Sequence, residues 1–156
     1  MNRSYAALAV FLLCMPFAGM TIAQDLSDPA AMAVHDSIED MHGDADGFDA
    51  AFEIVTEAFR FGDPTTIADL GSYPMQAFAR NEAYDLLEQA NLLDNFDDLL
   101  QPETQERIAA QDYSDLLVTA DGVMFADGAM WMANVCLDET CSETTWAIIT
   151  LNDDSA

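Results

Sequence analysis

Residues 113–152 read YSDLLVTADGVMFADGAMWMANVCLDETCSETTWAIITLN and carry the clearest structural signal in the chain. Asp121-Gly122 and Asp127-Gly128 are turn dipeptides that separate short apolar runs. The alternation before the C-terminus adds a further strand. The predicted strands are 113–119, 123–125, 129–136 and 144–151. The C-terminal part is therefore expected to be an antiparallel meander.

Upstream of this meander the sequence predicts mainly helices. Phe48, Phe52, Val55 and Phe59 recur at helical spacing and form one apolar stripe, which Gly62 ends. Asp-Pro pairs and Pro102 mark helix starts. The predicted helices are 29–41, 49–61, 64–70, 82–100 (with a break near 91 or 95) and 103–111, and a short strand is predicted at 73–79. Helices followed by a meander indicate an α+β fold.

The charge balance excludes several classes of partner. The 156 residues include 4 Lys+Arg, all arginine, against 29 Asp+Glu, which gives a formal net charge of -25. Such a field repels phosphates, so neither nucleic acid nor an anionic membrane surface is an expected partner. With 51% apolar residues the chain can still build a core. The acidic surface favours adaptation to salt over recognition of a cationic partner.

The N-terminus has the pattern of a secretory signal peptide. Arg3 precedes an apolar run from Ala6 to Phe17, and Thr21-Ile22-Ala23 provides small residues for cleavage. Leu13 disfavours lipidation of Cys14. The protein is therefore expected to be periplasmic or secreted, without membrane insertion after cleavage. The expected organisation is a signal peptide (1–23), an acidic linker or short helix (24–47), a single α+β domain (48–152) and a tail (153–156).

Cleavage leaves two cysteines, Cys136 and Cys141. An even count in an exported protein favours a disulfide, here at the tip of a hairpin. The alternative is that the two cysteines are half of a zinc site. A closed zinc site needs four ligands, however, and the two histidines lie far upstream. Residues 42–47, with Glu53, resemble a calcium loop, although His42 replaces the first aspartate; an acidic linker leading to a helix cap is favoured. No metal and no cofactor are expected.

Several short motifs resemble those of small exported bacterial proteins of unknown function with the cone-shaped α+β fold. This is the fold of the nuclear-transport-factor-2-like superfamily, which includes ketosteroid isomerases and polyketide cyclases. The motifs are Tyr73-Pro74-Met75, Gly122-Val123-Met124, Asp127-Gly128, Trp131-Met132 and Ile149-Thr150-Leu151-Asn152. The resemblance covers residues 48 to 152. It implies a curved antiparallel sheet wrapped by helices around an apolar cavity, and a homodimer through the open sheet face.

Function is expected in that cavity, because fold alone does not define an activity. Tyr73, Met75, Met124 and Trp131 are the candidate ligand-binding residues, since methionine and aromatic side chains adapt to irregular apolar ligands. The favoured hypothesis is an exported non-catalytic protein that holds a small apolar or amphipathic ligand or a protein partner. The alternative is an isomerase- or hydratase-like enzyme, for which the catalytic residues stay unknown; Tyr73, Asp115 and Trp131 are weak candidates.

Overall fold

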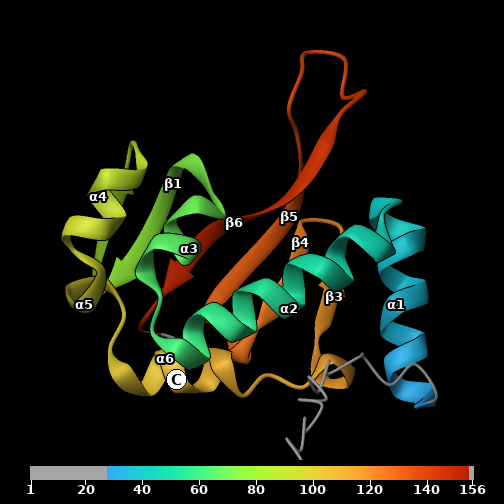
Figure 1. Cartoon of the computed structure of the whole chain (residues 1–156), viewed down its shortest axis with the longest axis horizontal. Helices are drawn as coiled ribbons and strands as arrows, with labels where there is room; N and C mark the ends of the chain where they lie inside the picture. The colour runs from blue at the N-terminus through green and yellow to red at the C-terminus, as the bar shows by residue number, and fades with distance from the viewer. Residues whose placement is uncertain (1–27, 155–156) are drawn as a thin grey trace, which may run out of the picture.

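A computed structural model describes residues 28–154, which form a layer of helices against a six-stranded sheet (Figure 1). The α+β prediction is confirmed. The predicted signal peptide (1–23) lies outside the described residues, as do residues 24–27, 155 and 156. Within the described part of the chain, no helix is long and apolar enough to span a bilayer.

Three helices open this part of the chain, close to their predicted positions. They are α1 (Pro29–His42), α2 (Ala45–Phe61) and α3 (Pro64–Asp69). Each begins after an aspartate, Asp28, Asp44 or Asp63, whose carboxylate accepts a backbone N–H from the first turn. This cap satisfies a donor that the helix itself leaves free.

The short connection between α1 and α2 bears on the acidic stretch before α2 and on the domain boundary expected at residue 48. Residues from Ala45 onward are already helical, so the acidic stretch is a helix cap, and the calcium-loop alternative is wrong. The expected domain boundary at residue 48 falls within α2. Val34 and Ile38 of α1 are buried in the same core as the later elements.

The sheet is mixed, whereas the sequence suggested an antiparallel one. The strands are β1 (Gly71–Ala79), β2 (Glu82–Leu86), β3 (Leu117–Thr119), β4 (Gly122–Phe125), β5 (Met130–Cys136) and β6 (Thr144–Asn152), in the order β2-β1-β6-β5-β4-β3. The pair β1–β6 is parallel, with Ala77 opposite Leu151, and the remaining pairs are antiparallel. The last strand along the chain therefore lies between the first strand and the meander.

Two predicted elements differ from the structure. The helix predicted at 82–100 is instead strand β2 followed by α4 (Gln89–Asp94) and α5 (Phe96–Leu99), because pairing with β1 overrides the local helix propensity of residues 82–86. The strand predicted at 113–119 begins only at Leu117; residues before it form a 3-10 turn (Tyr113–Asp115) capped by Asp112. Helix α6 (Pro102–Ala109) lies near its predicted position.

Aromatic rings fill the space between α2 and the sheet. Phe48 is fully buried and its ring centroid lies 4.8 Å from that of Trp146, in an edge-on arrangement. Phe52, Tyr113 and Phe125 surround it at centroid distances of 6.0 to 6.2 Å. The region in which the resemblance places a ligand cavity is thus occupied by packed side chains.

Strands β5 and β6 extend beyond the body as a hairpin (Figure 1). Cys136 and Cys141 form the predicted disulfide in its loop. The Asp138 carboxylate accepts hydrogen bonds from the hydroxyls and backbone amides of Thr140 and Ser142, which hold its pKa well below the usual range. The loop is thus ordered by its own residues.

Candidate functional site

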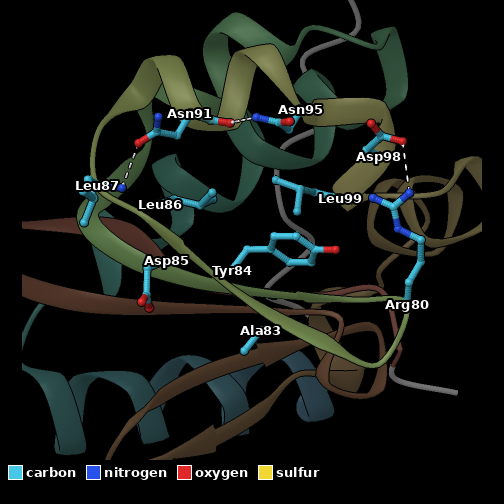
Figure 2. Close-up of a pocket in the computed structure, with 10 residues that line it drawn as sticks. All are labelled: Arg80, Ala83, Tyr84, Asp85, Leu86, Leu87, Asn91, Asn95, Asp98 and Leu99. Carbon is cyan, nitrogen blue, oxygen red and sulfur yellow. Dashed lines mark hydrogen bonds and ion pairs between the residues drawn. The ribbon is translucent and has the colours of Figure 1, made fainter.

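A cleft opens at one edge of the sheet, between β2 and the short helices α4 and α5 (Figure 2). We call it the edge cleft. Its volume is about 440 Å³, within the range of roughly 300–1,000 Å³ typical of small-molecule sites. It is lined by Arg80, Ala83, Tyr84, Asp85, Leu86, Leu87, Asn91, Asn95, Asp98 and Leu99.

Two asparagines shape the helical wall of the cleft. The side-chain oxygen of Asn91 accepts the backbone N–H groups of Leu87 and Glu88 at 3.0 and 3.1 Å, which turns the chain from β2 into α4. The side-chain amide of Asn95 donates to the Asn91 carbonyl at 2.9 Å, where α4 ends. These bonds order the turn from β2 into α4 and the end of α4, which form the helical wall of the cleft.

The edge cleft has a mixed lining, with apolar side chains at its back and polar side chains around them. Leu86 and Leu99 are buried at 4% and 2% exposure, and the ring of Tyr84 lies between the strand and the helices (Figure 2). The Tyr84 hydroxyl donates to Glu82 at 3.1 Å. This combination suits a molecule with an apolar body and a polar end.

Arg80 and Asp98 meet at one end of the cleft. Nη1 of Arg80 donates to Oδ1 of Asp98 at 3.3 Å, and both side chains are more than half exposed. Arg80 lies in the β1–β2 turn with φ 56°, and the next residue, Asn81, has φ 60°. Arg80 therefore places one of the few cations of the chain at the end of the edge cleft.

The four residues predicted to bind a ligand do not meet at a common site. Met75 is buried in the core, and the Tyr73 hydroxyl donates to the Ala68 carbonyl at 3.0 Å. Burial, and then the charge of Asp69, raise the pKa of Tyr73. Met124 and Trp131 are paired across β4 and β5 and alternate with buried neighbours, so they lie on the outer face of the sheet.

A second polar group joins α1, α2 and the 3-10 turn. The Tyr113 hydroxyl donates to Oδ1 of Asp49 at 2.6 Å, and Nε2 of His35 lies 3.7 Å from Oδ2 of the same carboxylate. Burial, followed by the bond to Asp49, raises the pKa of Tyr113 far above its ordinary value. Asp115, the other residue considered for catalysis, lies instead near α6 and the β4 end.

The same group contains the donors that could hold a metal ion. One atom each from His35, Asp46 and Asp49 lies within 4.8 Å of the other two. Asp46 is fully exposed, and Asp49 already accepts the Tyr113 hydroxyl. Three such donors fall short of the four that a closed structural zinc site uses.

We expect Tyr113→Phe to lower the free energy of unfolding by about 1.5–3 kcal/mol at pH 7, since the lost hydrogen bond has a carboxylate acceptor. The raised pKa means that this contribution is complete below about pH 10 and is lost as pH rises through the folded-state pKa. Urea unfolding at pH 7 and pH 11 measures both effects. The difference in the free energy of unfolding between wild type and Tyr113→Phe should be smaller at pH 11 than at pH 7.

Tyr73→Phe is the matched control, because its hydroxyl donates to a neutral carbonyl. We expect a loss of only about 0.5–1.5 kcal/mol. Two results would contradict the assignment of a charge-assisted bond. One is an equal loss of unfolding free energy in the two variants at pH 7. The other is a Tyr113→Phe loss that is the same at pH 11 as at pH 7.

Comparison with known proteins provides no relative. A scan against family models, a search of curated proteins and a search of solved structures each find no match. The site assignment therefore depends on geometry. Sequence reasoning missed the edge cleft because residues 82–86 were expected to be helical; Asn81, a turn-forming residue, was the available signal of a hairpin there.

Proposed function

We propose that this protein is an exported, non-catalytic binding protein that holds a small amphipathic ligand in the edge cleft. The observation that carries the proposal is the cleft itself, which combines a buried floor of Leu86 and Leu99 with an exposed ion pair at one end. Sites for small molecules generally join an apolar lining to a few fixed polar groups. The packed aromatic interior makes this edge a better location than the centre of the fold.

Export is supported by two features. The Cys136–Cys141 disulfide is a bond that persists in oxidising compartments. The N-terminal sequence has the order of a signal peptide, with Arg3 before an apolar run. A periplasmic or secreted location is consistent with both.

The arrangement of titratable groups favours binding over catalysis. An isomerase or hydratase needs an acid and a base directed at one substrate atom. In the edge cleft, the Tyr84 hydroxyl donates to Glu82 and Arg80 donates to Asp98, so these groups engage each other in pairs. The isomerase- or hydratase-like alternative is accordingly the second choice.

We also propose kinship with the nuclear-transport-factor-2-like superfamily and a protein partner or second copy on the outer sheet face. Two features support the kinship. The helices come mostly before the meander, and β6, the last strand of the chain, lies inside the sheet between β1 and β5. Leu117 is 50% exposed and pairs across the sheet with Met124, which in turn pairs with Trp131, and this apolar row supports the partner or second copy.

A binding assay with N-phenyl-1-naphthylamine tests the proposal. This neutral dye fluoresces more strongly in an apolar environment than in water. We expect saturable binding to the wild-type protein. Asn95→Trp places an indole at the helical wall of the cleft, and we expect it to weaken dye binding at least tenfold. Fluorescence titration measures both affinities, and thermal unfolding reports whether the variant is folded.

Asp94→Trp is the matched control, because Asp94 is the exposed neighbour of Asn95 and does not line the cleft. We expect its affinity to stay within twofold of wild type. If the wild type fails to bind the dye, or if folded Asn95→Trp binds it as well as Asp94→Trp does, the edge cleft is not the binding site.

A further inference from the structure

We infer that the edge cleft selects amphipathic carboxylates, with the acid group on Arg80 and the apolar chain along β2. This inference rests on the proposed function and adds the chemical class of the ligand. The chain uses cations sparingly: it has four arginines and no lysine against 29 acidic residues. One of these arginines lies at the end of the edge cleft, which has Tyr84, Leu86 and Leu99 in its lining (Figure 2).

The backbone at Arg80 is the first supporting observation. Arg80 and Asn81 both have positive φ, in a two-residue turn between β1 and β2. Such turns favour glycine, asparagine or aspartate, and a long side chain in this conformation is unusual. The turn is also fixed from outside, since the Asn81 N–H donates to Asp154 at 2.7 Å and the Asp153 N–H to the Phe78 carbonyl at 2.8 Å. An arginine at such an unfavourable position points to a role for its side chain.

The hydrogen bonding of the guanidinium is the second observation. Arginine has five N–H donors, and its strongest contacts with carboxylates use two of them in parallel. The contact with Asp98 uses only Nη1, at 3.3 Å, between side chains that are 55% and 68% exposed. Exposed pairs of this kind contribute little and exchange readily. Asp98 marks where a carboxylate meets Arg80, and a ligand carboxylate with better geometry can displace it.

The shape of the cleft supplies the apolar half of the argument. From the end at Arg80 it runs along β2, past Tyr84 and Leu86, to Leu87, which is 69% exposed (Figure 2). At about 3.3 Å per residue, the five residues of β2 span roughly 13 Å. A linear alkyl chain of medium length can lie along this floor with its head at Arg80.

The net charge of the protein opposes any anion at long range, yet it does not remove this preference. At 0.15 M ionic strength the Debye length is about 8 Å, so distant acidic groups are largely screened. The charged side chains that line the cleft are Arg80, Asp85 and Asp98, and Glu82 accepts the hydroxyl of Tyr84 beside them. A headgroup at the Arg80 end responds first to the ion pair there, Arg80 with Asp98. Replacing either one should therefore change the affinity for a charged headgroup and leave the affinity for a neutral one almost unchanged.

The experiment compares decanoate with 1-decanol by displacement of N-phenyl-1-naphthylamine at pH 7.5 and 0.15 M salt. We expect wild type to bind decanoate at least tenfold more tightly than decanol. Arg80→Gln should remove this preference and keep the affinity for decanol. Asp98→Asn removes the competing carboxylate and should strengthen decanoate binding several-fold. Arg60→Gln, at the exposed end of α2, is the matched control and should match wild type.

The outcomes separate the two proposals. If both probes bind and Asn95→Trp blocks them, but Arg80→Gln leaves the ratio of affinities unchanged, the carboxylate assignment is overturned and the proposed function stands. Tighter binding of decyltrimethylammonium than of decanoate would also overturn it, in favour of a cationic ligand at Asp98. If the dye itself does not bind wild type, there is no signal to displace and the proposed function fails.

Discussion

Phe48→Ala is expected to lower the free energy of unfolding by about 3–5 kcal/mol, the range for removing a large aromatic side chain from a packed core. Phe48 is fully buried, and its ring lies within about 6 Å of four other aromatic rings. The space it leaves cannot collapse easily, because Phe125 and Trp146 are held by the sheet. A domain of this size has a total stability of about 5–15 kcal/mol, so the loss is a large fraction of it.

Urea unfolding followed by tryptophan fluorescence measures this effect, since Trp146 lies against Phe48. Phe61→Ala is the matched control: Phe61 ends the same helix but is 76% exposed. We expect its effect to stay within about 0.5 kcal/mol. A loss below about 1 kcal/mol for Phe48→Ala would mean that the interior is not closely packed, and a central ligand cavity would again be the better hypothesis.

Gly122→Ala is expected to destabilise the protein by about 3 kcal/mol or more, through two causes that act together. Gly122 has φ 143°, a conformation that side chains rarely adopt. A Cβ atom there would lie 2.3 Å from the carbonyl oxygen of Met132 on the neighbouring strand. Because that neighbour is backbone, β4 and β5 must move apart, which adds overpacking to the backbone strain.

Gly43→Ala separates the two causes. Gly43 also has a positive φ, 74°, but its Cβ would meet nothing within 4 Å. We expect a loss of about 1 kcal/mol there from conformation alone. Chemical denaturation gives both values, and hydrogen exchange of the β4 and β5 amides locates the damage. Equal losses in the two variants would show that the close approach between Gly122 and Met132 is absent.

The helices and the meander were predictable because each carries a local signal. The stripe of Phe48, Phe52, Val55 and Phe59 predicted α2, and all four side chains are buried. Turn dipeptides located β4 and β5 for a similar reason, since glycine permits the positive φ that such a turn requires, as at Gly122 and Gly128. Parallel pairing of β1 with β6 has no such signal, because the two strands are separated by most of the domain.

The candidate site was harder to predict than the fold. Residues 82–86 contain Glu, Ala and Leu, which favour helices, and only contact with β1 makes them a strand. Without that strand, the edge cleft cannot be seen in the sequence. Alternation along β4 and β5 likewise does not say which face meets the helices, so Met124 and Trp131 were assigned to an interior that Met130 and Met132 occupy.

The central position of β6 also constrains when the protein can finish folding. Synthesis proceeds from the N-terminus, and β6 is made after every other strand of the sheet. Until it emerges, the hairpin of β1 and β2 and the meander of β3 to β5 are separate pieces, each with an open edge where β6 will pair. Contacts that join such distant segments form slowly. The nascent chain therefore has a late period in which those edges are exposed to self-association or to a protecting chaperone.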